Sequence, residues 1–111
     1  MGAITTHILD TTRGRPAQGV DVELEYHGTI WESVGTGKTN DDGRVQGLTS
    51  GDSLRAGTYR LRFHVSSYFL GLGTTAFYPY VEIVFQVIAT EEHYHVPLLL
   101  NPFGYATYRG S

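Results

Sequence analysis

The stretch Thr58-Tyr59-Arg60-Leu61-Arg62-Phe63-His64-Val65 decides the fold class of this chain of 111 residues. Apolar side chains occupy every second position in it, and two arginines and a histidine stand between them. Successive side chains point to opposite faces of a β-strand, so the alternation predicts a strand with one buried and one polar face. Residues 20–26 repeat the pattern with acidic residues on the polar side, which predicts a second strand of the same kind.

Turn-forming residues divide the rest of the chain into short segments. The sequence contains 14 glycines, and recurring turn signals are typical of short strands joined by tight turns. Asn40-Asp41-Asp42-Gly43 predicts a tight turn, and residues 50–53 predict a longer loop. Asn101-Pro102-Phe103-Gly104 predicts a hairpin turn between strands at 93–100 and 105–109. We expect a helix at residues 66–75, and the glycines there predict that it is short.

Residues 80–90 differ from the two alternating strands because they are apolar on both faces near their middle. Such a strand is typically central in a sheet, or covered on one side by the core and on the other by a partner subunit. Counting from Ile4, we expect seven or eight strands, one short helix, and no internal repeat or linker. The sequence therefore predicts a single domain, residues 1–111, with an all-β architecture of two packed sheets.

Composition excludes several partners and chemistries. The sequence has no cysteine, which excludes disulfides, thiolate metal sites and thiol nucleophiles. A formal net charge of −3 gives no basic surface for nucleic acid. No apolar run approaches the ~20 residues of a membrane span. The absence of a signal-peptide core and of a C-terminal peroxisomal signal favours a cytoplasmic location, with the periplasm and the peroxisome left open.

Gly35-Thr36-Gly37-Lys38-Thr39 is similar to the end of a phosphate-binding loop. That loop requires a glycine five positions before Gly37, where this chain has Glu32, and a helix directly after it. Without them the backbone N–H groups do not form a phosphate cradle. We therefore reject a phosphate-binding loop at this segment.

His93 and His95 flank Tyr94 on a predicted strand, so both imidazoles are expected on one face. The residues alone leave three interpretations open. The pair is solvated, or it binds a metal with His7 as third ligand if the strand of His7 is adjacent. In the third interpretation one ring is an acid–base group, since a histidine pKa is easily moved near neutrality.

Arg44 and the C-terminal segment have two interpretations each. Arg44 directly follows the predicted turn at 40–43 and is either a solvated turn residue or, if it faces the histidines, part of a site. Residues 105–111 are either a last strand with a two-residue tail, or a segment that folds into a site. In the second case Ser111 contributes its hydroxyl and the terminal carboxylate.

Three separated stretches carry a resemblance that covers essentially the whole chain. They are Thr5-Thr6-His7-Ile8-Leu9-Asp10, Thr39-Asn40-Asp41-Asp42-Gly43-Arg44-Val45, and His93-Tyr94-His95-Val96-Pro97 with the terminal Tyr108-Arg109-Gly110-Ser111. With these stretches the chain resembles the transthyretin family, and specifically its branch of 5-hydroxyisourate hydrolases. Hormone-carrying transthyretins share the fold but lack the histidine pair and the four terminal residues. The chain departs from the usual pattern at Asn101 and Ala106, where the family usually has serine.

The resemblance implies a transthyretin-like sandwich assembled as a homotetramer, a dimer of dimers, with active sites in the clefts where two dimers meet. It implies hydrolysis of 5-hydroxyisourate, a small-molecule substrate of urate degradation, to 2-oxo-4-hydroxy-4-carboxy-5-ureidoimidazoline, without a metal or an organic cofactor. The residues carried over as catalytic are His7, Arg44, His95 and Ser111. The residues carried over as substrate-binding are His7, Arg44, Tyr108, Arg109, Gly110 and Ser111. The alternatives are a non-enzymatic small-ligand carrier of the transthyretin type and a sandwich module similar to carboxypeptidase regulatory domains.

Overall fold

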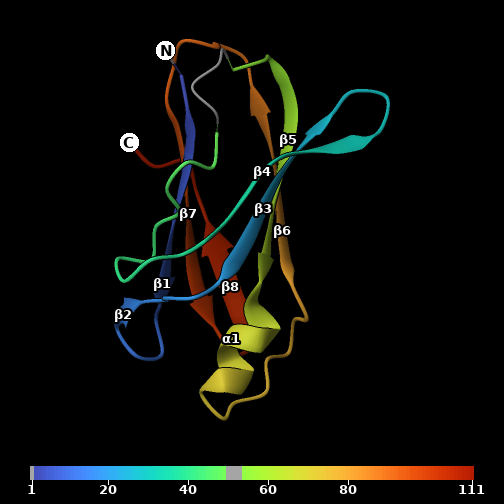
Figure 1. The fold of residues 1–111 in the computed structure, drawn as a ribbon. Helices are drawn as coiled ribbons and strands as arrows, with labels where there is room; N and C mark the ends of the chain where they lie inside the picture. Colours follow the sequence, from blue (N-terminus) through green and yellow to red (C-terminus); the bar gives the residue numbers. More distant parts are fainter. Residues whose placement is uncertain (1, 50–53) are drawn as a thin grey trace.

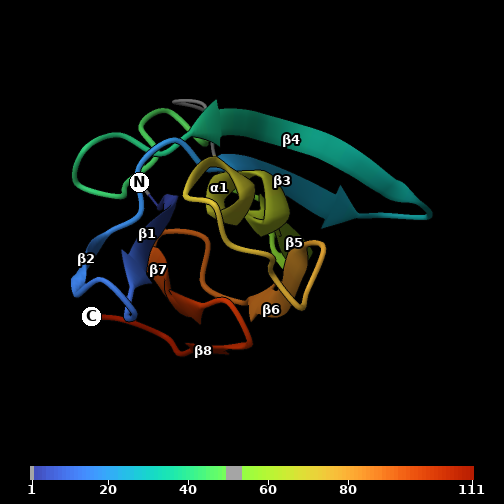
Figure 2. The same ribbon diagram turned by 90° about the horizontal axis from the view of Figure 1, so that it is seen from below.

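Two four-stranded sheets pack face to face in the computed structural model, which describes residues 2–49 and 54–111 (Figures 1 and 2). Sheet A has the order β2 (Arg15–Pro16), β1 (Ile4–Asp10), β7 (Tyr94–Asn101) and β8 (Gly104–Thr107). Sheet B has the order β4 (Trp31–Lys38), β3 (Asp21–His27), β5 (Gly57–His64) and β6 (Val81–Val87). Helix α1 (Val65–Gly71) follows β5 and lies at one end of the sandwich (Figure 1). These eight strands and one short helix of the described residues confirm the predicted all-β sandwich.

The alternation at 58–65 creates the buried face of β5. Tyr59, Leu61 and Phe63 are buried between the sheets, whereas Arg60 and Arg62 lie on the outer face of sheet B. The strand ends one residue before Val65, which begins α1 and still packs into the core. Burying this many apolar side chains is the main favourable contribution to folding, at about 1.5–3 kcal/mol for each large side chain.

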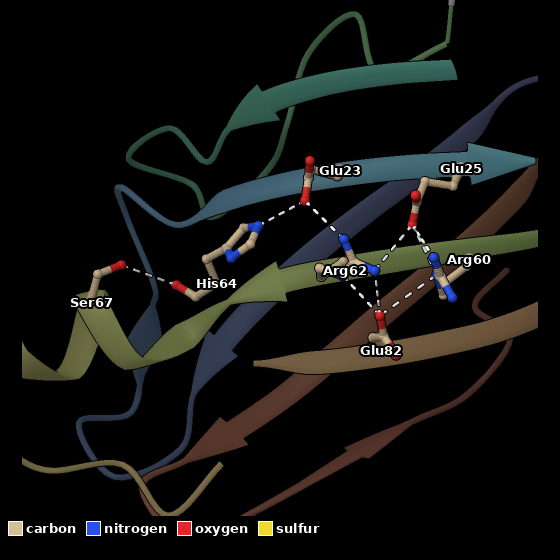
Figure 3. Close-up of polar contacts among 7 residues, drawn as sticks. All are labelled: Glu23, Glu25, Arg60, Arg62, His64, Ser67 and Glu82. Carbon is tan, nitrogen blue, oxygen red and sulfur yellow. Dashed lines mark hydrogen bonds and ion pairs between the residues drawn. The ribbon is translucent and has the colours of Figure 1, made fainter. Parts of the chain in front are cut away.

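The outer face of sheet B carries a network of ion pairs (Figure 3). The strand register places Arg62 opposite Glu23 of β3 and Glu82 of β6, and Arg60 opposite Glu25. Arg60 Nη2 lies 2.8 Å from Glu25 Oε1, and Arg62 Nη2 lies 2.7 Å from Glu82 Oε2. Because these cross-strand partners satisfy one another, the network supports the sheet rather than leaving charges available for a ligand.

Strand β6 corrects one prediction. It lies at an edge of sheet B, so the expectation of a central position is wrong. An apolar run does not distinguish a central strand from an edge strand. The strands that pair with it are set by the topology of the sheet and not by the residues of the run. Val84 on the outer face of β6 is 58% exposed and Ile88, just beyond the strand, is 79% exposed. Coverage of this strand by a partner subunit stays a prediction.

Other boundaries differ by a few residues from the expected ones. The helix predicted at 66–75 spans Val65–Gly71, and the strand predicted at 80–90 spans Val81–Val87. The hairpin turn predicted at 101–104 is present, with Asn101 Oδ1 accepting the N–H of Phe103 at 2.9 Å. The loop predicted at residues 50–53 lies outside the described residues. Among the described residues, no helix has the length and apolarity that crossing a membrane requires.

A buried carboxylate ties α1 to sheet A. Asp10, at the end of β1, is 0% exposed, and its Oδ1 accepts the backbone N–H groups of Thr12 and Arg13 at 3.0 and 3.2 Å. The hydroxyl of Tyr68 on α1 donates to Asp10 Oδ2 at 2.7 Å. Burial first, and then this hydrogen bond to a carboxylate, raise the pKa of Tyr68. The contact therefore fixes α1 against β1, the strand that carries Thr5 and His7.

Candidate active site

Four chain segments lie side by side on sheet A and present residues to its outer face. His95 on β7 is opposite Thr5 on β1 in a parallel pair. An isolated bridge joins His7 of β1 to Arg44, and a second joins His95 to Gly110 of the C-terminal tail. Directly opposed residues of paired strands share a face, so Arg44, Thr5, His7, His95 and Gly110 are brought to the same side.

That side faces away from the core. Along β1 the residues at even positions from Ile4 to Asp10 are buried, whereas Thr5 and His7 are half-buried on the opposite face. In β7, Tyr94 and Val96 point into the core, and His95 alternates with them. Figure 2 shows the C-terminal tail on the side of sheet A that faces away from sheet B.

The turn at 40–43 positions Arg44. Asn40 Oδ1 accepts the backbone N–H groups of Asp42 and Arg44 at 2.9 and 3.1 Å, and the N–H of Gly43 donates to the Asn40 carbonyl at 2.9 Å. Gly43 has φ +75°, and its carbonyl accepts the N–H of Ile8 at 2.9 Å. A Cβ at Gly43 would clash with the Ile8 carbonyl oxygen, so glycine allows the turn to dock directly on β1. The predicted tight turn is confirmed, and it delivers Arg44 beside His7.

The tail returns to β7 after an interruption. β8 ends at Thr107, opposite Leu98, because the next position on β7 approaches Pro97, which has no N–H for the ladder. Thr107 Oγ1 donates to the Pro97 carbonyl at 2.8 Å, and pairing resumes where Gly110 N–H donates to the His95 carbonyl at 2.8 Å. The last ladder contact thus places Ser111 next to His95.

One threonine hydroxyl connects the two histidines. Thr5 Oγ1 lies 2.9 Å from His93 Nε2 and 2.8 Å from His95 Nδ1. Both rings therefore lie on one face, as their spacing predicted. Burial is the largest cause that lowers the pKa of His95, and the positive charges of Arg44, His7 and His93 lower it further. A lowered pKa favours the neutral form of His95, which is able to accept a proton.

These groups border a cavity of about 420 Å³ that is large enough for a small polar molecule. Its lining residues are Thr5, Thr6, Arg44, Val45, Gln46, His93, His95 and Ser111. His7 is not in the lining, although it is on the same face and paired with Arg44. In the described part of the chain no carboxylate forms an ion pair with Arg44, so its guanidinium is available to a ligand.

Tyr108 and Arg109 are not brought to this cavity. Both border a separate cavity of about 240 Å³ against β6. The Arg109 guanidinium lies 4.4 Å from the centre of the Tyr94 ring and pairs with Glu92 at 3.0 Å. Their assignment as substrate-binding residues of this subunit's site stays a prediction.

Sequence reasoning considered His93 only as one of the histidine pair, and neither Thr5 nor His93 was among the residues assigned to the site. The His-x-His spacing contained the signal for His93, because it places both rings on one face. Thr5 had no local signal, since only the parallel pairing of β1 with β7 brings it between residues 88 and 90 positions away.

The geometry also addresses the rejected and open alternatives. Residues 31–38 form β4, so the rejection of a phosphate-binding loop there is confirmed. Within residues 2–49 and 54–111, no group of three or more His, Asp or Glu side chains is placed to hold a metal ion. An imidazole, a guanidinium and a hydroxyl around one cavity, from His95, Arg44 and Ser111, are suited to proton transfer and to stabilising an oxyanion.

Comparison with known proteins gives the chain's relatives. A family model described as the HIUase/Transthyretin family matches residues 4–110. The Arabidopsis thaliana uric acid degradation bifunctional protein TTL is 49% identical over 97% of this chain, which spans only 37% of that protein's length. The 5-hydroxyisourate hydrolase of Mus musculus is 45% identical, with 97% of this chain and 94% of that protein covered.

Two solved structures have the same fold. The Klebsiella pneumoniae 5-hydroxyisourate hydrolase superposes with a TM-score of 0.88 at 36% identity and covers 100% of both chains. Sea bream transthyretin in complex with thyroxine superposes with a TM-score of 0.91 at 31% identity, with 96% of this chain and 93% of that chain covered.

Proposed function

The chain belongs to the HIUase/Transthyretin family, and from this premise we propose that it hydrolyses 5-hydroxyisourate in urate degradation. The observation that carries the proposal is the convergence of Arg44, His95 and Ser111 on one cavity, from segments far apart in the sequence. A carrier needs a binding channel, but it does not need a histidine and an arginine that face one cavity.

The reaction needs three catalytic functions from the protein. Water must lose a proton as it attacks a ring carbonyl carbon, the tetrahedral oxyanion must be stabilised, and the departing ring nitrogen must be protonated when the C–N bond breaks. We assign proton removal to His95, because it borders the cavity and its lowered pKa favours the neutral ring. A positioned general base contributes about 10²–10⁴-fold in rate.

Arg44 stabilises the developing negative charge and holds the polar substrate through its forked donors. His7, next to Arg44 on β1, completes the proton-shuttling pair: it receives the proton that His95 took from water and donates one to the leaving nitrogen. Ser111 contributes its hydroxyl or the terminal carboxylate, which orients the water or a histidine. Tyr108, Arg109 and Gly110 complete the substrate-binding set of this proposal. No step requires a metal or an organic cofactor.

A tetramer would close the site. The cavity lies on the outer face of sheet A, which is open in the single chain. A second subunit docked on that face would exclude water, which strengthens electrostatic interactions inside the cleft. We therefore propose a homotetramer built as a dimer of dimers, and the mass measured by size exclusion with light scattering tests it. The cytoplasmic location stays a prediction.

The direct test is an ultraviolet assay with freshly generated 5-hydroxyisourate. The variants are His7→Ala, Arg44→Ala, His95→Ala and a deletion of residues 108–111, each checked by circular dichroism for the sandwich. We expect each to lose most turnover while it stays folded, because the three substitutions change the outer face of sheet A and the deletion removes residues that are not buried in the core. Near-normal kinetics in any two of the four would overturn the site assignment.

The free chain end has its own test. Extra residues after Ser111 would block the carboxylate and crowd the cavity, so a C-terminally tagged protein should be impaired and an N-terminally tagged one should not. Full activity with the C-terminal tag would contradict a role for the free end.

The second candidate function is a small-ligand carrier, favoured by the likeness to sea bream transthyretin. A carrier would leave the decay of 5-hydroxyisourate at its spontaneous rate, so the same assay separates the two candidates. A structural module of the carboxypeptidase-regulatory type would be a monomer without turnover.

A further inference from the structure

We propose that Thr5 and His93 are positioning residues that form a hydrogen-bonded relay and select the tautomer in which His95 acts. The proposal rests on the role of His95 as base in the proposed hydrolase. It goes beyond that role by assigning functions to two residues that have no part in the proposed mechanism.

The relay follows from the number of protons available. Thr5 Oγ1 is within 2.8 Å of His95 Nδ1 and 2.9 Å of His93 Nε2, so it bonds to both rings at once. A hydroxyl has one proton and two acceptor lone pairs, so Thr5 can donate to at most one ring and must accept from at least one. The tautomers of the two histidines are therefore coupled. When both rings are neutral, two arrangements use the Thr5 proton between the rings, and in a third both rings donate to Thr5 while its proton points into the cavity.

In the first arrangement His95 Nδ1–H donates to Thr5, and the Thr5 hydroxyl donates to His93 Nε2. The lone pair of His95 is then on Nε2, the ring nitrogen that Thr5 does not occupy. In the second arrangement His93 Nε2–H donates to Thr5, and Thr5 donates to His95 Nδ1. The proton of neutral His95 is then on Nε2, so that nitrogen cannot take a proton from water.

Of the two arrangements that use the Thr5 proton between the rings, only the first is active. When His95 takes the proton from water, its Nδ1–H bond to Thr5 remains and stabilises the imidazolium that forms. The Thr5 hydroxyl is a better acceptor while it donates to His93, because hydrogen bonds in a chain polarise one another. The role of Thr5 toward His95 is thus the one that a carboxylate has in a Ser-His-Asp triad.

His93 makes the relay sensitive to protonation. A charged His93 has N–H on both ring nitrogens, so it must donate to Thr5 and excludes the first arrangement. The Thr5 proton is then free to be donated to His95 Nδ1, as in the second arrangement. The charged groups around the pair are Arg44 and His7 facing His95, and Arg109 and Glu92 beside His93, and Ser111 lines the same cavity. Protonation of His93 should therefore favour the inactive tautomer of His95 without any change in fold.

The mutational test uses two matched pairs. Thr5→Val keeps the β-branched shape and removes the hydroxyl, whereas Thr5→Ser keeps the hydroxyl. We expect Thr5→Val to lower kcat about 10- to 100-fold with KM changed less than about threefold, and Thr5→Ser to retain kcat within about threefold of the wild type. A purely structural hydroxyl would give equal kinetics in the two variants, which would overturn the proposal.

The second pair separates hydrogen bonding from charge at residue 93. His93→Gln keeps an acceptor for the Thr5 hydroxyl but does not titrate, whereas His93→Phe removes both properties. We expect His93→Gln to retain kcat and to extend activity to lower pH, and His93→Phe to lower kcat. An unchanged acidic limb in His93→Gln would contradict the protonation effect.

A spectroscopic readout needs no substrate. Long-range ¹H–¹⁵N correlation spectra of the ¹⁵N-histidine-labelled wild-type protein should show neutral His95 as the Nδ1–H tautomer. In Thr5→Val the Nε2–H tautomer should increase. A wild-type His95 in the Nε2–H form would overturn the relay whatever the activity. Absence of hydrolysis by a wild-type protein that shows the expected tautomer would refute the proposed function and leave the hydrogen-bond coupling in place.

Discussion

Gly110→Ala should displace His95 without unfolding the protein. A Cβ at position 110 would lie 2.6 Å from His95 Cδ2, 3.2 Å from Pro97 Cγ and 3.3 Å from His95 Cγ. Carbon atoms in favourable contact are about 3.5–4.0 Å apart, so the ring or the tail must move by about 1 Å. The tail therefore approaches the His95 ring at a distance that a residue without a side chain allows.

The size of the effect follows from that displacement. A misplacement of about 1 Å at a reacting group can cost about 10²-fold in rate, because catalytic geometry must be held closely. If the tail moves instead, the hydrogen bond from Gly110 N–H to the His95 carbonyl is lost, and Ser111 leaves the cavity with it. Both routes lower kcat/KM by about 10²-fold, whereas stability changes little near a chain end.

The assay compares kcat/KM for 5-hydroxyisourate and the urea midpoint of Gly110→Ala with those of Gly104→Ala. Gly104 is a matched control in the same C-terminal segment, since a Cβ there would meet no atom of the described residues closer than 3.7 Å. Gly104→Ala should keep nearly full activity. Full activity in Gly110→Ala would refute both the packing of the tail on His95 and the need for it.

Three further predictions concern stability. Gly43→Ala should lower the free energy of unfolding by about 2 kcal/mol or more and reduce turnover. The reason is that φ of residue 43 is +75° and a Cβ there would clash with the Ile8 carbonyl. A urea midpoint near the wild-type value would contradict this. Tyr68→Phe should lower the free energy of unfolding, measured in urea, by about 1–3 kcal/mol, because it removes a hydrogen bond to the buried Asp10 carboxylate. An unchanged urea midpoint would show that the carboxylate finds another donor. Burial chiefly lowers the pKa of His95 below its ordinary value of 6.5, so the folded state binds fewer protons than the unfolded state as pH falls past that value. The wild type should therefore lose stability relative to His95→Ala below about pH 6.5 and not above it, and parallel urea midpoints from pH 8 to pH 5 would refute the shift.

Much of the fold was predictable because strand patterns are local. The alternation at 58–65 and 20–26 identified β5 and β3 and their buried faces, since neighbouring side chains point to opposite sides of a strand. The edge position of β6 was not predictable, because its apolar run indicates burial and not which strands flank it. The end of β8 at Thr107 depends on its partner Pro97, which has no N–H to continue the ladder.

The candidate site, like the fold, was predictable from the sequence only in part. The sequence by itself identified the residue types and the turn that precedes Arg44, and it placed His93 and His95 on one face. Only the tertiary structure decided that β1 runs parallel to β7 with Thr5 opposite His95, that Arg44 pairs with His7, and that Gly110 packs on the histidine ring. The physical reason is that the direction in which a side chain points is set within a few residues. Which side chains meet is set by strand register between segments some ninety residues apart.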